Sequence, residues 1–174
     1  LEAMLPYFRE HYGNPSNRGH ALGSRAAAAV DDARQSVAAL IGTPAPESIV
    51  FTSGATESIN LALKGVVEAA DAGRRRVVTV QGEHKATLET LAALERRGVD
   101  VVSAPVDGEG RVDPEAVARA LDTPTALLTC LHGNNEVGTI QPIDALGRLA
   151  RDRGVLFHVD AAQTAGKLPI DVEA

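Results

Sequence analysis

The chain has 174 residues, a formal net charge of −6 and 44% hydrophobic residues, which is an ordinary composition for a globular domain. There is no basic footprint of the kind that binds nucleic acid, and no apolar run approaches the roughly 20 residues that cross a bilayer. We therefore expect no nucleic-acid partner and no membrane partner. The single cysteine, Cys130, cannot form an internal disulfide, which fits a cytoplasmic protein.

The first predicted elements are helical. A short helical stretch ends near Tyr12 and is followed by a turn over residues 13–17, which are rich in Gly, Asn and Pro. Apolar residues at helical spacing then predict a long helix over residues 23–40, and Gly42 and Pro44 end it.

Five short apolar runs then alternate with four helical patterns. Strands are predicted over residues 48–52, 76–81, 99–104, 125–131 and 155–160, and helices over 57–70, 85–97, 114–121 and 143–153. Continuous Val, Leu and Ile runs are typical of strands covered on both faces. The alternation predicts an α/β fold with a mostly parallel sheet, whose ligands bind beyond the carboxyl ends of the strands.

Polar residues follow two of these strands at places suited to an anion and a planar ligand. After the first strand, residues 52–57 (TSGATE) open a helix, and Thr56 adds a hydroxyl donor to the free N–H groups of its first turn. After the second strand, His84 is placed to stack on a ligand or move protons. The alternatives are an ordinary helix start and a capping or solvated histidine.

Two further polar groups follow the fourth and fifth predicted strands. Residues 132–138 (HGNNEVG) include Asn135, whose amide can bind a carboxylate or phenolic oxygen, although Asn and Gly also suit a plain turn. Asp160 ends an apolar strand, where an acid is costly unless it is paired, and Gln163 follows; the alternative for Asp160 is a helix cap. Together with Thr56 and His84, these residues predict one binding site at one edge of the sheet.

In this order, the motifs resemble the class V aminotransferase family, and specifically cysteine desulfurases of the NifS/IscS type. The matching stretches are residues 13–16 (GNPS), 51–58 (FTSGATES), 83–85 (EHK), 132–138 (HGNNEVG) and 158–163 (HVDAAQ), leading to 166–169 (GKLP). The resemblance implies a pyridoxal-phosphate-dependent transferase large domain of the aspartate aminotransferase type, in three αβα layers. Residues 1–20 would be a partial N-terminal segment and 21–174 the first portion of the large domain. The C-terminal small domain would be absent, and both ends would be truncated.

The resemblance also implies a role for each site residue and no metal. Ala55 and Thr56 would hold the phosphate of the cofactor. His84 would stack on the pyridine ring and relay protons, which is its catalytic role, and Asn135 would contact the cofactor or the substrate carboxylate. Asp160 would pair with the pyridine nitrogen, and Gln163 would hydrogen-bond the ring hydroxyl. The implied reaction converts L-cysteine to L-alanine and leaves persulfide sulfur on the enzyme for iron–sulfur cluster or thiocofactor synthesis. A homodimer and a sulfur-acceptor or iron–sulfur scaffold protein are the implied partners.

Two residues of that chemistry are not expected in this stretch. The family's Schiff-base lysine follows a Ser-x-His segment on a later strand. Lys85 is rejected for this role because residues 83–85 match the motif of the stacking histidine, Lys64 is interpreted as part of a solvated helix face, and Lys167 is interpreted as a structural or surface residue. Cys130 lies in an apolar strand, which predicts an inert thiol rather than the sulfur carrier. We therefore expect the chain alone to release no alanine from L-cysteine. The alternatives are a selenocysteine lyase, another class V enzyme, or a non-catalytic pseudoenzyme or scaffold module.

Overall fold

The computed structural model describes residues 1–173, which form two compact units. The first unit comprises Leu1–Phe51 together with the segment that begins at Pro169, and the second is Thr52–Leu168. Within residues 1–173, no helix combines the length and the apolar character that crossing a membrane requires.

The first unit is helical. It contains α1 (Leu5–Arg9), α2 (Ala21–Ile41) and the 3₁₀ helix η1 (Pro46–Ser48). The ring of His20 caps α2 by accepting a hydrogen bond from the amide of Gly23 at 3.1 Å, and Gly42 ends the helix in the left-handed conformation, with φ 77°. The predicted long helix is therefore confirmed.

The strand predicted over residues 48–52 is wrong. This stretch contains the end of η1 and then an irregular segment up to the start of α3 (Ala55–Ala69). The apolar residues Ile49, Val50 and Phe51 resemble a strand locally, but a strand exists only when its N–H and C=O groups pair with a neighbour. No strand of the described chain pairs with them, so the sheet has four strands and not five.

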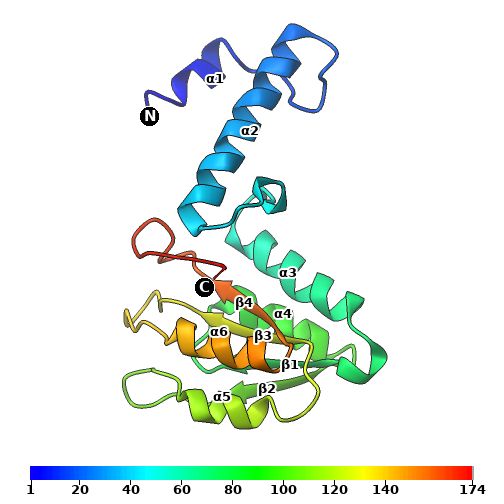
Figure 1. Ribbon diagram of the computed structural model, residues 1–174, viewed down its shortest axis with the longest axis vertical. Coiled ribbons are helices and arrows are strands. Elements are labelled where there is room, and N and C mark those ends of the chain that lie inside the picture. Colours follow the sequence, from blue (N-terminus) through cyan, green and yellow to red (C-terminus); the bar gives the residue numbers. More distant parts are fainter. Residues whose placement is uncertain (174) are drawn as a thin grey trace. The chain divides into compact units, whose positions relative to one another are not determined.

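The second unit contains the parallel sheet (Figure 1). Its strands are β1 (Arg76–Val80), β2 (Asp100–Ala104), β3 (Leu127–Leu131) and β4 (Leu156–Asp160), hydrogen-bonded in the order β2-β1-β3-β4. Every pairing in the sheet is parallel, as the continuous apolar runs predict.

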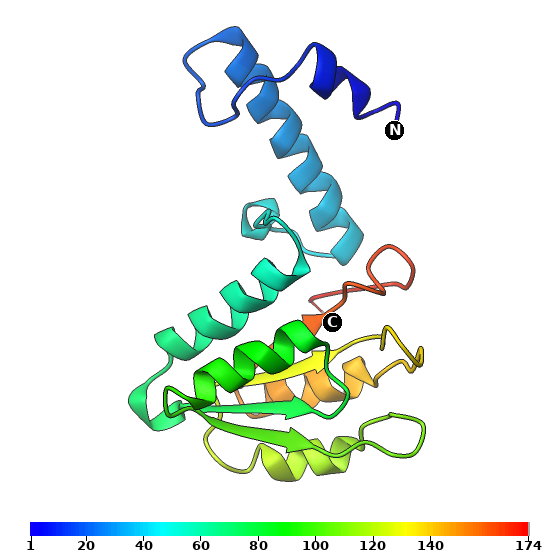
Figure 2. The same cartoon turned by 180° about the vertical axis from the view of Figure 1, so that it is seen from behind.

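Helices cover both faces of this sheet. The helices are α3, α4 (Lys85–Glu95), α5 (Pro114–Ala120) and α6 (Ile143–Asp152), and the short 3₁₀ helix η2 (Ala72–Arg74) lies between α3 and β1 in the chain. Val77 and Leu127 point into a core shared with α3 and α4, whereas Val78 and Leu128 point into a second core shared with α5 and α6. Figures 1 and 2 show these pairs of helices on opposite sides of the strands. The predicted three-layer α/β fold is confirmed.

The strand order creates a switch point between β1 and β3. From β1 the chain passes through α4 to β2 on one side, and from β3 it passes through α6 to β4 on the other side. Open α/β sheets bind ligands in the crevice outside the carboxyl ends of the strands at such a point. The loops that follow β1 and β3 therefore define where a site is expected.

Candidate functional site

Hydrogen bonds join the three loops that follow β1, β3 and β4. The side-chain Nδ2 of Asn134 donates to the carbonyl oxygen of Gly82 at 3.0 Å, which ties the loop after β3 to the loop after β1. The amide of His132 donates to the carbonyl oxygen of Asp160 at 2.9 Å, which ties the loop after β3 to the end of β4. These loops form one continuous rim at the carboxyl edge of the sheet.

His84 lies on this rim directly before α4. Gly82 takes the left-handed conformation, with φ 84°, and so allows the chain to turn sharply after β1. The Nδ1 atom of His84 accepts a hydrogen bond from the amide of Ala86 at 3.2 Å and caps α4. A neutral ring that accepts at Nδ1 carries its proton on Nε2. His84 therefore caps α4 through Nδ1, as the alternative interpretation predicts, while the rest of its side chain remains exposed.

Asp160 is the last residue of β4 and is buried, with only 6% of its surface exposed. Its Oδ1 accepts a hydrogen bond from the amide of Ala162 at 3.0 Å. A buried carboxylate is stable only when it is paired or hydrogen-bonded, so this position suits a cationic ligand. Gln163 follows in a turn closed by the amide of Thr164 and the carbonyl oxygen of Ala161 at 2.9 Å, and its side chain is exposed.

The two asparagines of the loop after β3 differ in their surroundings. The Oδ1 of Asn134 accepts hydrogen bonds from the amides of Glu136 and Val137 at 2.8 and 2.9 Å, while its Nδ2 holds Gly82. Asn134 therefore stabilises the turn, and a turn is the alternative interpretation given above for residues 132–138. Asn135 is exposed beside it, with its side chain open to a ligand.

Ala55 and Thr56 form the first turn of α3. In both views of the second unit, α3 runs antiparallel to the strands, so its N-terminus lies on the side where the strands end (Figures 1 and 2). The first N–H groups of a helix have no carbonyl partner within it and favour an anion. Glu57 turns back to Ser53, whose amide and hydroxyl donate to its carboxylate at 2.7 and 2.6 Å and lower its pKa.

The structure thus places the predicted site residues on one side of the second unit. His84, Asn135, Asp160 and Gln163 lie in or next to the loops that follow β1, β3 and β4. Thr56 is predicted to follow a strand, but no strand precedes it in the structure. It lies at the start of α3, which packs on α4, β3 and β4. The roles of these residues remain predictions.

Glu83 is a site residue that the sequence reasoning missed. Its side chain is 6% exposed, and its Oε1 accepts hydrogen bonds from the amide of Leu131 at 3.0 Å and the hydroxyl of Thr79 at 3.4 Å. Burial raises the pKa of Glu83 to about 7, and the nearby charge of Asp160 adds to this rise. The available signal in the sequence is Thr79, which interrupts the apolar run of β1, because a buried hydroxyl needs a hydrogen-bond partner.

Two histidines inside the second unit pair with threonines. Nδ1 of His132 lies 2.9 Å from the hydroxyl of Thr164, and Nδ1 of His158 lies 2.8 Å from the hydroxyl of Thr129. Burial lowers the pKa of both rings, and the effect is opposed by Asp144 for His132 and by Asp160 for His158. Both rings are held in place by these hydrogen bonds, and their neutral forms are favoured.

Cys130 and Lys85 have very different surroundings. Cys130 is fully buried in β3, and its pKa is raised by burial and, once Glu83 has ionised, by that neighbouring charge, which disfavours the reactive thiolate. Lys85 is exposed and pairs with Glu89 one turn along α4 at 3.5 Å. Among residues 1–173, no group of three or more His, Cys, Asp and Glu side chains is arranged to hold a metal ion.

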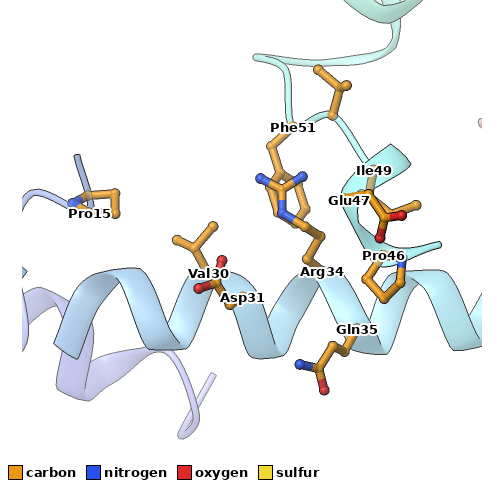
Figure 3. A pocket seen from close by; sticks show the side chains of 10 residues that line it. Pro15, Val30, Asp31, Arg34, Gln35, Pro46, Glu47, Ile49 and Phe51 are labelled. Atoms are coloured by element: carbon orange, nitrogen blue, oxygen red, sulfur yellow. The ribbon is translucent and has the colours of Figure 1, made fainter. Parts of the chain in front are cut away.

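A separate open cavity of about 1000 Å³ lies in the first unit, between α2 and the segment around η1. Figure 3 shows the guanidinium group of Arg34 above the ring of Phe51, at 5.1 Å from the ring centre. The cavity contains none of the predicted site residues, and its walls come from α2, from η1 with the irregular segment that follows it, and from Pro15. It is therefore not the site predicted from the motifs.

The model of the aminotransferase class-V family matches residues 1–174, which is the whole chain. The chain belongs to this family. Among curated relatives, the cysteine desulfurase IscS of Anaeromyxobacter sp. (strain Fw109-5) is 51% identical over 173 residues, and the mitochondrial cysteine desulfurase of Drosophila melanogaster is 47% identical over 174. These alignments cover 99% and 100% of this chain but only 43% and 37% of the relatives, so the chain spans less than half of their length.

Solved structures share the fold of the chain. A structure described as "NIFS-LIKE PROTEIN" has a TM-score of 0.92 at 42% identity, and one described as "SspA in complex with cysteine" has a TM-score of 0.93 at 39% identity. The match covers 99% of this chain in both cases, and 47% and 49% of the solved chains. The family resemblance predicted from the motifs is confirmed, and class V aminotransferases and cysteine desulfurases are pyridoxal-phosphate-dependent enzymes.

Proposed function

We propose that this chain supplies most of the cofactor pocket of a pyridoxal-phosphate-dependent cysteine desulfurase. The observation that carries this proposal is the buried carboxylate of Asp160, which ends β4 on the same rim as His84. The donor set fits the cofactor, because it combines an acid for a ring nitrogen with a helix N-terminus for a phosphate. We also propose that residues 1–20 are a partial N-terminal segment and that residues 21–174 belong to the large domain of the parent enzyme.

Asp160 would bind the ring nitrogen of the cofactor. Pyridoxal phosphate, when bound, supplies a ring that withdraws electrons from the substrate carbon. A carboxylate beside the ring nitrogen favours its protonated form, which strengthens that withdrawal. The hydrogen bond from Ala162 keeps Oδ1 of Asp160 fixed in the orientation it has at the strand end.

Thr56 and Ala55 would bind the phosphate. Their amides lie in the first turn of α3, where the helix dipole favours an anion, and the Thr56 hydroxyl is a further donor. The carboxylate of Glu57 is already hydrogen-bonded to Ser53, so it is directed toward the segment before the helix.

His84, Asn135 and Gln163 would orient the ring and the substrate. Because Nδ1 of His84 is held by the amide of Ala86, its exposed ring can stack on the cofactor with Nε2 as the edge that donates or accepts a proton. The exposed amides of Asn135 and Gln163 would hydrogen-bond the substrate carboxylate and the ring hydroxyl, respectively.

We propose that neither the covalent lysine nor the sulfur-carrying cysteine lies among these residues. Lys85 is directed to Glu89 and Cys130 is buried, which supports this part of the proposal. The substrate of the parent enzyme would be L-cysteine, since the similar protein SspA was solved in complex with cysteine. The parent enzyme would be a cytoplasmic homodimer that passes sulfur to an acceptor or iron–sulfur scaffold protein.

The phosphate and ring sites are tested separately by comparing the binding of pyridoxal phosphate and pyridoxal, which lacks the phosphate. Thr56→Ala should weaken the binding of pyridoxal phosphate and leave that of pyridoxal unchanged, because one hydrogen bond to a charged group contributes about 1.5–3 kcal/mol. Asp160→Asn should weaken the binding of both. Equilibrium dialysis measures the two affinities.

The control is Thr123→Ala, since Thr123 is an exposed threonine outside the proposed site. Equal loss of both ligands in Thr56→Ala, or no loss in Asp160→Asn, would contradict the proposed pocket. Alanine release from L-cysteine with added pyridoxal phosphate should not exceed that of the free cofactor. Turnover above that background would show that a lysine and a thiol within residues 1–174 do the chemistry.

A further inference from the structure

Two buried carboxyl groups lie close together under the proposed pocket. Glu83 follows β1 and Asp160 ends β4, and each is 6% exposed. Among residues 1–173, no cationic side chain forms an ion pair with either group. Two carboxylates that share a buried site cannot both ionise without a large cost, so one of them keeps a proton.

The surroundings of Glu83 identify it as the group that keeps the proton. Its neighbours on β1 and β3 are the hydroxyl of Thr79, the amide of Leu131 and the thiol of Cys130, all of which are uncharged. On α4, the buried hydroxyl of Thr87 faces the same carboxyl group. Asp160 on β4 is therefore the charged group that faces Glu83 from the packed elements.

The two oxygens of the Glu83 carboxyl group have different surroundings. Oε1 accepts from Leu131 and Thr79, whereas Oε2 is buried and, within residues 1–173, forms no hydrogen bond of ordinary geometry. The hydroxyl of Thr87 lowers the pKa of this carboxyl group, but by less than burial raises it. An ionised carboxylate with a buried oxygen that no donor meets in good geometry is costly, whereas the same oxygen bearing a proton carries no charge. The geometry therefore favours a neutral carboxylic acid with its proton on Oε2.

We propose that Glu83 is a positioning residue whose neutral carboxyl group fastens the end of β3 to the loop that carries His84 and leaves Asp160 as the one buried negative charge beneath the ring. The bond from Leu131 to Glu83 fixes the residue directly before His84. This inference rests on the proposed function, because it identifies Asp160 as the charged group that the ring nitrogen of the cofactor would meet. It is tested without cofactor.

The direct test is a titration of the Glu83 side-chain carboxyl carbon by ¹³C NMR in the unaltered chain. The midpoint should lie near 7, well above the ordinary value of 4.5. The resonance is assigned by its loss in Glu83→Gln, or through neighbouring nuclei if that variant fails to fold. In Asp160→Asn, the midpoint should fall, because a neighbouring charge has been removed. The control Glu95→Gln, at an exposed position of α4, should leave it unchanged.

Chemical unfolding gives an independent readout. Between pH 4.5 and about 7, the folded chain would bind a proton at Glu83 that the unfolded chain has released, so stability falls as pH rises through this window. Relative to Glu83→Gln, the folding equilibrium constant of the unaltered chain should drop by up to about tenfold per pH unit and then level off. A purely structural glutamate would produce no such slope.

A Glu83 midpoint near 4.5 would overturn the inference, as would a midpoint that does not move in Asp160→Asn. If every variant of the pocket bound pyridoxal phosphate as tightly as the unaltered chain does, the proposed function would be contradicted. The titration result for Glu83 would not be affected by that outcome. Exchange of the Leu131 amide proton completes the test: it should be slow in Glu83→Gln, which keeps an acceptor, and fast in Glu83→Ala.

Discussion

Single residues decide how closely the loops of the rim approach each other. Gly133 is buried against the segment that follows β4, and a methyl group at its Cα would lie 2.6 Å from Cγ2 of Thr164 and 3.2 Å from Cδ1 of Ile140. The hydroxyl of the same threonine pairs with His132. Glycine is therefore required here by the close packing of two loops, and the motif HGNNEVG has a structural reason for its first glycine.

Gly133→Ala should lower the free energy of unfolding by about 1–3 kcal/mol, because the added methyl group forces Thr164 or the backbone to move. Gly65→Ala is the matched control: Gly65 lies within α3 with nothing within 4 Å of an added Cβ. It should stabilise the chain by about 0.4–1 kcal/mol. Denaturant titration of both variants checks the prediction, and equal effects would show that the loop contact is not tight.

At the scale of elements, α3 is held by one buried stripe. Its residues Ile59, Leu63 and Val67 recur at spacings of four and pack with Val77 and Leu127 of the sheet. The same helix presents Ala55 and Thr56 at its N-terminus. The packing of the stripe therefore fixes the place of the proposed phosphate site.

Leu63→Ala should cost about 2–5 kcal/mol of stability, since Leu63 is fully buried and the change leaves a cavity between α3 and the sheet. Leu61→Ala, two positions earlier and 55% exposed, should change stability by less than about 0.5 kcal/mol. Thermal unfolding followed by circular dichroism measures both. A small effect of Leu63→Ala would show that α3 contributes little to the core.

At the scale of the whole molecule, both hydrophobic cores belong to the second unit. Every residue of the two buried clusters lies between Ile59 and Val155, inside Thr52–Leu168. The helices on each face and all four strands come from the same stretch. This unit thus contains the contacts that a domain needs to fold.

The segment 52–168 should therefore fold when it is expressed without the first unit. We expect one cooperative unfolding transition in circular dichroism and dispersed amide signals in NMR, because both cores are retained. The chain has no tryptophan, so fluorescence of that residue offers no substitute. A gradual transition with collapsed NMR signals would show that the first unit is needed for folding.

Much of the fold and part of the site follow from local signals in the sequence. The helix that Gly42 ends, the continuous apolar runs of the four strands and the order of the motifs each depend on residues near each other in the chain. Helix caps and hydrophobic periodicity act over a few residues, which is why these elements were predicted within a few positions. The family was predicted for the same reason, because its motifs are short.

The tertiary structure decided whatever depends on partners distant in sequence. Residues 49–52 have the composition of a strand, yet no strand of the described chain lies beside them to complete the ladder. In the sequence, nothing distinguishes Glu83 from other acidic residues. It is buried only in the folded chain, where the amide of Leu131 in β3 donates to it and Asp160 of β4 lies near it. Strand pairing and the ionisation of a buried group are set by neighbours in space, and those neighbours exist only once the sheet has formed.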